Sequence, residues 1–462
     1  MTGLRLFFIV LLACCMVSNG QGQSVDTLWV ESNTATSRVL FDAEDIVVWP
    51  HPAAPELSLI IGTDKGTFPD GGIFVWNLSG ILQQRINISH PNSIDIRQGI
   101  SLGNNSVDVV VVTMRDHRQI RIFRIDRDER KLVDVTSPQM KKIFKEPYGL
   151  ALYKRPVDQA LFAFVSSKSH DFRGELWLLR LADNGTGYFD AEIVRKMNLG
   201  NGIFEGMIVD DALGFLYAAE DSVGVHKYNV NAVGREDQLA LFAGPEEVKR
   251  KVEDLALYKC ENGSAFILAS SPGTASIRIY KSDREGDNRH RYKMLHIIKN
   301  RTATAGDGIT VANTIFTESF PFGFLAWHNE SMAQFRLFRL EQLAQQGFQA
   351  CTEKKSLSSA GSDAGEMKVV PEDIMISNYP NPFNGSTRIT FELSESSKVD
   401  ITLYNTKGES VKNWPETTRE AGKHSLSWDG RYNSGMMAPS GVYLLKISTG
   451  SGISSHKVIF AK

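Results

Sequence analysis

The strongest constraint on the fold is a long succession of short apolar segments, separated by Gly, Pro, Asn and Asp, from about residue 38 to 345. The segments are rich in Val, Ile, Phe, Tyr and Leu and have the length of β-strands. They recur in pairs, with a strand ending in small or polar residues followed by one ending in an aromatic, as at 111–114 and 120–123 or 268–271 and 276–280. The repetition is too irregular for the WD40 or kelch signatures. About 300 residues of such pairs predict an all-β domain, a six-bladed β-propeller, with tandem β-sandwiches as the alternative.

The N-terminus predicts export. An apolar run at 6–17 follows Arg5 and is too short to span a bilayer. We interpret residues 1–20 as a signal peptide cleaved near Gly20. A lipoprotein signal that ends at Cys14 is the alternative. Because no later segment is long and apolar enough for a membrane helix, the mature protein is expected to be secreted or held at the cell surface.

Charge and cysteine content exclude some functions. The chain has 51 Lys and Arg against 53 Asp and Glu, so a basic nucleic-acid-binding surface is not expected and any anionic ligand needs a local cluster of cations. After cleavage only Cys260 and Cys351 remain. Their positions form neither a disulfide framework nor a zinc-ligand spacing, and Cys260 is predicted to be a buried, inert thiol.

A second unit follows a change in composition. Residues 348–372 are polar and small and are interpreted as a linker. Alternating strands and regular turns between about 373 and 462 then predict a small Ig-like β-sandwich.

The motifs of this second unit carry a resemblance. The sequence NYPNPFN at 378–384 is followed by AGKH at 421–424, WDG at 428–430 and SGVY at 440–443. This series resembles the C-terminal sorting domain of type IX secretion cargo. The resemblance implies Sec export, passage through the type IX secretion machinery and release or surface attachment. A generic carbohydrate-binding sandwich is the alternative.

The most informative motif of the first unit is EGMIVDD at 205–211, which closes on LYAAED at 216–221. It places carboxylates near the ends of two neighbouring strands, and oxygen-rich clusters of this kind hold calcium. The run resembles the signature of the β-propeller phytase family, EGMxxDDxxGxLYxAEED. About ten residues match that family in order across the domain at 38–345.

The resemblance implies a set of calcium ligands. FDAEDIVVW at 41–49 resembles the family's DADDPAIW, RKVEDL at 250–255 resembles RDIEGL, and DGI at 307–309 resembles DGID. Carried over residue by residue, the metal-binding positions are Glu44, Asp45, Glu205, Glu220, Asp221, Glu253 and Asp307.

The resemblance also implies a phosphate site. The catalytic residues would be Glu205, Lys65, Arg115, Tyr148 and Lys168, and the last four would also bind substrate together with Arg97. Arg97 lies in NSIDIR, similar to the family's NNVDIR, where Asp95 and Arg97 are expected to organise the rim. Taken one at a time, such a Lys or Arg is usually a solvated surface charge and an Asp beside Gly is usually a turn former.

The sequence departs from the family at two places. Lys251 stands where the family has an acidic residue, and Asp254 replaces a glycine. The segment 301–306 lacks acidic residues before Asp307, and Thr310 follows where another Asp is usual. Because lost carboxylates weaken calcium binding, the number of ions is left open.

Three functions remain at this point. The first is an exported, calcium-dependent phosphatase that hydrolyses phosphomonoesters of myo-inositol hexakisphosphate, with calcium activating a water. The second is a non-catalytic surface module for binding or adhesion with structural calcium sites. The third is a calcium-dependent propeller lactonase or similar hydrolase, against which Lys65, Arg115 and Lys168 argue.

Overall fold

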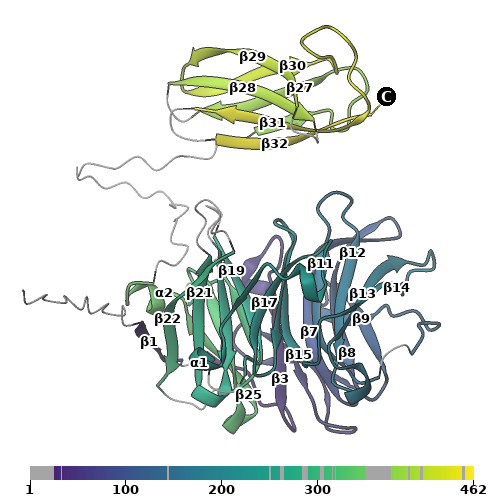
Figure 1. The fold of residues 1–462 in the computed structure, drawn as a ribbon, viewed down its shortest axis with the longest axis vertical. Coiled ribbons are helices and arrows are strands. Elements are labelled where there is room, and N and C mark those ends of the chain that lie inside the picture. Colours follow the sequence, from purple (N-terminus) through teal and green to yellow (C-terminus); the bar gives the residue numbers. More distant parts are fainter. Residues whose placement is uncertain are drawn as a thin grey trace, which may run out of the picture. The chain divides into compact units, whose positions relative to one another are not determined.

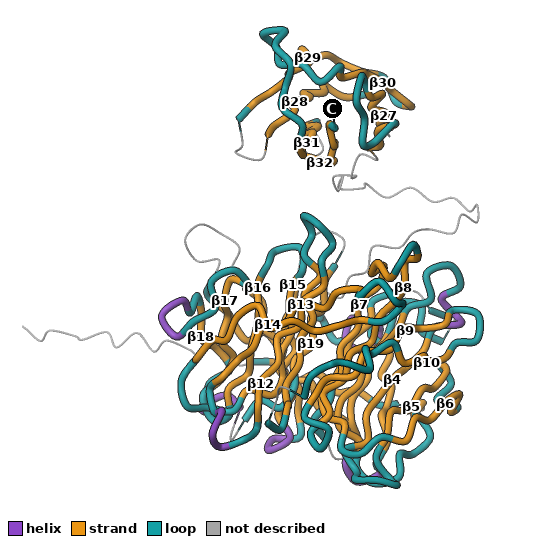
Figure 2. Tube along the Cα trace, turned by 90° about the vertical axis from the view of Figure 1, so that its right-hand side faces the viewer, coloured by secondary structure: helices purple, strands orange, loops and turns teal. Residues whose placement is uncertain are grey.

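The structure is a computed structural model of the whole chain and is almost entirely β (Figures 1 and 2). It describes residues 25–32, 34–142, 145–248, 251–260, 265–282, 290–301, 306–314, 316–317, 319–348, 376–393, 396–405, 409–449 and 453–461. The predicted signal peptide, and the predicted linker apart from Phe348, lie outside these residues. The chain divides into two compact units, Met1–Lys355 and Ser356–Lys462. Within the described residues no helix is long and apolar enough to cross a membrane.

The first unit is a six-bladed β-propeller, as the sequence predicts. Four of its six sheets have simple up-and-down order. Blade 1 contains β3 (Ala43–Trp49), β4 (Leu59–Asp64), β5 (Gly72–Asn77) and β6 (Leu82–Asn87). Blade 2 contains β7 (Pro91–Leu102), β8 (Asn105–Met114), β9 (Gln119–Asp126) and β10 (Lys131–Asp134). Blade 3 contains β11 (Pro147–Lys154), β12 (Leu161–Ser167), β13 (Glu175–Asp183) and β14 (Phe189–Asn198). Blade 4 contains β15 (Phe204–Asp210), β16 (Phe215–Glu220), β17 (Gly224–Asn229) and β18 (Ala240–Phe242).

The last two blades recruit the strands that begin the chain. Blade 5 contains β19 (Leu255–Lys259), β20 (Ala265–Ser271), β21 (Ser276–Ser282) and β22 (Tyr292–Asn300), and β1 (Asp26–Val30) pairs with β22 in parallel. Blade 6 contains β23 (Ile309–Ala312), β24 (Phe324–Asn329) and β25 (Gln334–Arg339), and β2 (Thr34–Ala35) pairs with β25. Two strands that precede residue 38 therefore belong to the propeller, and β2 ties its first blade to its last.

In the described residues, the helices are single turns. The α-helical turns are α1 (Pro245–Val248) and α2 (Glu341–Ala344). The described 3-10 turns are η1 (Pro55–Leu57), η2 (His170–Phe172), η3 (Arg235–Asp237), η4 (Pro272–Thr274) and η6 (Glu330–Met332).

Burial explains why the strands are so apolar. Central strands pack between two neighbouring sheets, so both faces of β8 are buried and Val109–Val112 have no exposed surface. The outer strand β6, LQQRIN, is by contrast only partly buried. Each of the six hydrophobic clusters of this unit joins residues of two neighbouring blades, and one of them joins blade 6 to blade 1. The core is therefore a ring of six wedges.

The second unit is an Ig-like β-sandwich. One sheet contains β26 (Ile376–Tyr379), β27 (Thr387–Leu393) and β30 (Gly422–Trp428). The other contains β29 (Ser410–Arg419), β28 (Ser397–Asn405), β31 (Gly441–Ser448) and β32 (Ile453–Phe460). Its core gathers motif residues, because the buried Trp428 ring lies 5.3 Å from Phe383 and 4.8 Å from Tyr443.

One prediction from the sequence is wrong. Cys260 is buried, as expected, but it is disulfide-bonded and not a free thiol. The other three cysteines lie outside the described residues. Sequence spacing could not reveal this bond, because a disulfide depends on distance in the folded chain and not along it.

Candidate active site

The six innermost strands begin at one mouth of the central channel. Each of them, β3, β7, β11, β15, β19 and β23, contacts the innermost strand of the next blade, and β23 contacts β3 again. The residues at their starts therefore converge even though they are far apart in sequence. We call this end the entrance rim.

β-Bulges orient the side chains of the entrance rim. The register of β3 shifts between Ala43 and Ile46, and that of β15 shifts between Phe204 and Met207. The same shift occurs near the starts of β7 and β11. A bulge adds a residue to one strand and redirects its side chain. The residues Glu44 and Glu205 lie within these bulges.

Hydroxyl groups on the second strand of a blade fix the bulge of its innermost strand. The Thr113 hydroxyl accepts the Ser93 N–H at 3.0 Å and donates to the Tyr148 carbonyl of the next blade at 2.8 Å. Ser166 bonds in the same way to Gly149 and to Phe204. Each hydroxyl is hydrogen-bonded both to the bulge of its own blade and to the neighbouring blade. The positions of neighbouring rim residues are therefore fixed relative to each other.

In blade 6 a histidine replaces the hydroxyl. His328 Nδ1 accepts the N–H of Asp307 at 3.1 Å, and the ring is 2 % exposed. Burial lowers the pKa of His328 to about 3, so the ring is neutral and Nδ1 is free to accept. Asp307 is thereby fixed at the rim.

Glycines allow the blades to approach each other. A Cβ at Gly206 would lie 2.6 Å from Asp254 Cα, and one at Gly308 would lie 2.2 Å from the Glu44 carbonyl oxygen. Any other residue would push neighbouring innermost strands apart. The glycine after the rim residue is therefore needed for the narrow entrance.

Five carboxylates and two lysines meet at the entrance rim; we call them the carboxylate cluster. Lys65 Nζ lies 3.1 Å from Asp42, 2.5 Å from Glu44 and 3.7 Å from Asp307. Lys251 Nζ lies 2.6 Å from Glu253 and 3.6 Å from Glu205. With five acids and two bases, the cluster has an excess of carboxylates.

The pKa values reflect this excess. Burial, followed by the hydrogen bond and charge of Glu253, raises the pKa of Glu205 well above its usual value. Burial and neighbouring carboxylates raise the pKa of Asp307 to about 7. Buried, mutually repelling carboxylates favour additional positive charge.

The donors of the cluster fit calcium in their chemistry, because they are all carboxylate oxygens drawn from several loops and strands. Glu205 Oε2 and Asp221 Oδ1 are buried and accept no hydrogen bond from any described residue. Burial, opposed by the charge of Lys251, raises the pKa of Asp221. As they stand, no three Asp, Glu, His or Cys side chains of the described residues are arranged to hold a metal.

Cations surround Tyr148 beside the cluster. Lys168 Nζ donates to the Tyr148 hydroxyl at 3.0 Å and lies 4.4 Å from its ring centroid. The Arg115 guanidinium carbon lies 5.8 Å from the same ring. Burial, followed by the charge and hydrogen bond of Glu205, raises the pKa of Tyr148, so the phenol remains neutral. Tyr148 thus connects the cations with the carboxylate cluster.

Two predicted metal ligands have other contacts. Glu220 Oε2 lies 2.8 Å from His226 Nε2, and among the described residues it forms no ion pair with the carboxylate cluster. The Asp45 carboxylate accepts hydrogen bonds from the N–H groups of Ile46 and Ile94. Because Ile94 lies on β7, the second of these bonds connects blade 1 to blade 2. Burial raises the pKa of Asp45 to about 7.

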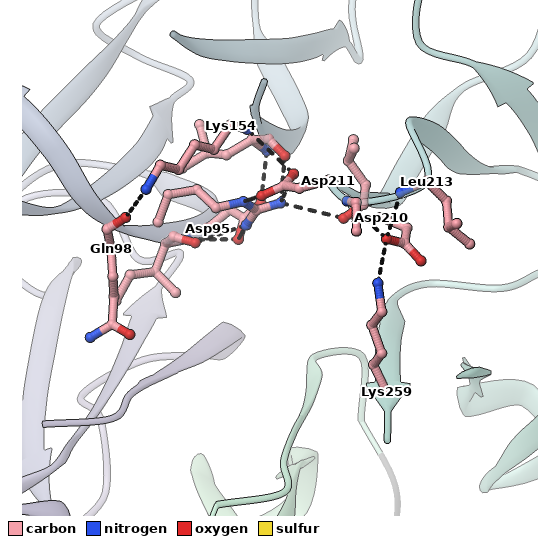
Figure 3. A network of polar contacts seen from close by, with 12 residues as sticks. Asp95, Gln98, Lys154, Asp210, Asp211, Leu213 and Lys259 are labelled. Atoms are coloured by element: carbon pink, nitrogen blue, oxygen red, sulfur yellow. Dashed lines mark hydrogen bonds and ion pairs between the residues drawn. The ribbon is translucent and has the colours of Figure 1, made fainter. Parts of the chain in front are cut away.

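Arg97 lines a cavity that none of Lys65, Arg115 and Lys168 lines. Figure 3 shows the carboxylates of its network, Asp95 and Asp211. Its guanidinium donates to Asp211 at 2.8 Å, to Asp95 at 3.0 Å and to the Leu152 carbonyl at 2.5 Å. Lys259 donates to Asp210 nearby at 2.8 Å. This network borders a cavity of about 400 Å³. These contacts favour a structural role for Arg97 over phosphate binding.

The structure adds residues that sequence reasoning missed. Asp42, His90 and His328 each contact a predicted site residue, and Asp116 contacts His90. Asp42 had a signal, because it lies within the motif 41–49. The histidines had none, since their role depends on contacts between separate strands.

Both units of the chain match known protein families. The family model described as Phytase matches residues 4–350. The chain belongs to the phytase family. The phytase-family domain is followed by a match to the FlgD Ig-like domain at 377–452. A curated relative, the 3-phytase of Bacillus subtilis (strain 168), is 29% identical over 318 residues, which cover 66% of this chain and 80% of the relative.

Among solved structures, PorZ of Porphyromonas gingivalis, described as a surface component of the type-IX secretion system, is 12% identical with a TM-score of 0.35. The alignment covers 91% of this chain, which spans about half (52%) of PorZ. At this TM-score the likeness carries no argument about fold or function.

Proposed function

We propose that this phytase-family protein is an exported, calcium-dependent phosphatase of the 3-phytase type that removes phosphate from myo-inositol hexakisphosphate. The observation that supports the proposal is that cations and carboxylates lie close together at the entrance rim. Lys168 and Arg115 lie beside Tyr148. The pKa of the Tyr148 hydroxyl is raised by burial and by Glu205 of the carboxylate cluster. Phosphoryl transfer needs such cations beside a metal site, because its transition state spreads negative charge over oxygens.

Each residue has a task in this proposal. Lys65, Lys168 and Arg115 hold phosphate oxygens, Arg115 with its planar fork and the lysines as point charges. The neutral Tyr148 hydroxyl orients one phosphate by a hydrogen bond. Glu205, Glu253, Glu44 and Asp307 would hold calcium, with Asp221 next to them. Calcium, when bound, would neutralise phosphate charge and lower the pKa of a water.

A second candidate function is a non-catalytic surface module with structural calcium sites. It is favoured by Lys65 and Lys251, which already neutralise part of the carboxylate cluster. For the second unit, we propose that it directs the protein to the type IX secretion machinery. This part of the proposal rests on the motif series at 378–384, 421–424, 428–430 and 440–443.

Phosphate release from inositol hexakisphosphate by the full chain tests the proposal. We expect release with calcium, loss of release with a chelator, and loss of at least about a hundredfold in Glu205→Ala. Glu236→Ala, an exposed carboxylate on η3, is the control and should keep full activity. A folded protein that binds calcium but releases no phosphate would support the non-catalytic module instead.

A further inference from the structure

Lys251 lies between two buried carboxylates of different blades. Its ammonium is 2.6 Å from Glu253 Oε1 and 3.6 Å from Glu205 Oε2. The side chains of both glutamates are 9% exposed, whereas that of Lys251 is 35% exposed. The lysine side chain therefore extends from the surface into the cluster, and its ammonium lies between these two carboxylates.

The two lysines divide the carboxylate cluster. Lys65 contacts Asp42, Glu44 and Asp307, and Lys251 contacts Glu205 and Glu253. Glu205 Oε2 accepts no hydrogen bond from the described residues, so its charge is balanced by proximity to Lys251 and not by a donor. An ammonium in this position occupies the place of a cation and repels a second one.

We propose that Lys251 substitutes for a divalent cation between Glu205 and Glu253, so that the entrance rim binds one calcium ion fewer than its carboxylates would hold without the lysine. The inference rests on the proposed function, because it concerns the calcium of that same site. It adds to that function that part of the positive charge of the site comes from the protein, as the Lys251 ammonium, and not from calcium. A divalent ion within about 4 Å of an ammonium is strongly repelled, because like charges at this distance are poorly screened in a partly buried site.

Calcium titration of the full chain and two variants tests this inference without using activity. Lys251→Gln removes the charge at similar length, and Lys251→Glu adds a carboxylate. Lys259→Gln is a matched control, because Lys259 is 36% exposed and is also paired with a buried carboxylate, Asp210, but lies on β19 away from the cluster. Isothermal titration gives the stoichiometry and affinity, and thermal unfolding with and without a chelator gives the linkage to stability.

We expect both Lys251 variants to bind one calcium more than the natural chain, with an affinity at that site increased by at least tenfold. Their unfolding temperature should fall in chelator and recover in calcium by more than that of the natural chain. Lys259→Gln should keep the natural stoichiometry. Circular dichroism in calcium shows whether each variant is folded, and either variant alone is sufficient for the comparison.

The outcomes separate this inference from the proposed function. If the natural chain binds calcium and both variants bind the same number with the same affinity, the role of Lys251 is overturned and the calcium-dependent function stands. If only the variants bind, the role of Lys251 is supported and the calcium-dependent function fails. If none binds, both fail.

Discussion

The Arg115 guanidinium donates a hydrogen bond to His90 Nε2 at 3.0 Å. Because arginine can only donate, Nε2 accepts, and the proton of the neutral ring lies on Nδ1, which is 3.1 Å from Asp116 Oδ1. Asp116 also accepts a hydrogen bond from Ser89 at 2.6 Å. His90 and Asp116 therefore orient Arg115 toward the Tyr148 ring.

His90→Ala should weaken phosphate binding. Without its acceptor the Arg115 fork is no longer oriented, and misplacement of a charged group can reduce kcat/KM by about ten- to a hundredfold. We expect the loss mainly in KM, measured by phosphate release. His117→Ala, on the turn that carries Arg115 and Asp116, is the control. An unchanged KM in His90→Ala would show that Arg115 does not need this support.

Tyr148→Phe should reduce activity and leave the fold intact. The ring, and with it the contacts to Lys168 and Arg115, remains, but the hydroxyl that accepts a hydrogen bond from Lys168 is lost. A hydrogen bond to a charged group contributes about 1.5–3 kcal/mol, so kcat/KM should fall by at least about tenfold. Thermal unfolding should change little. Full activity in the variant would remove Tyr148 from the site.

Thr113→Val should destabilise the propeller. Valine has a similar shape, but it leaves the Ser93 N–H and the Tyr148 carbonyl without their buried partner. We expect the free energy of unfolding to fall by about 1–3 kcal/mol in a denaturant titration. Thr310→Val, at a partly exposed position of β23, should have a smaller effect. Equal effects of the two substitutions would contradict the role given to this hydroxyl.

Arg97→Ala should affect stability and not phosphate affinity. Its removal leaves Asp95 and Asp211 without their shared cation. Breaking a fully buried ion pair costs about 3–5 kcal/mol, and because these side chains are half-buried we expect a smaller loss in the free energy of unfolding. Since Arg97 lies away from the carboxylate cluster, KM of the folded variant should stay within about twofold of the natural value. A large increase in KM without loss of stability would restore Arg97 as a substrate-binding residue.

The second unit should lose stability in mild acid. Burial lowers the pKa of His456 below its ordinary value of 6.5, and its Nε2 lies 2.9 Å from Asn378 Oδ1. Below about pH 6.5 the unfolded chain binds a proton that the folded unit resists, so the stabilisation present above this pH is lost as the pH falls toward the lowered pKa. Thermal unfolding of the full chain between pH 7.5 and about pH 5 measures this loss. His456→Gln should flatten the pH dependence, whereas His424→Gln should not.

The sequence determined the strand succession, the two units and the carboxylates of the entrance rim. Glu44, Glu205, Glu253 and Asp307 could be identified because each lies at or just before the start of an apolar strand and in a local motif. Strand periodicity and short motifs are local properties, so they can be read without knowing which blades are neighbours.

Only the tertiary structure decided what the individual charges contact. Arg97 and Arg115 both follow apolar strand residues, yet one is held by Asp211 and the other lies beside Tyr148. The sequence shows that Lys251 is basic where the family has an acidic residue. Its position between Glu205 and Glu253, however, depends on two separate blades. The role of a charged side chain is set by burial and by partners that are distant in sequence, and closing the ring of blades is what brings those partners together.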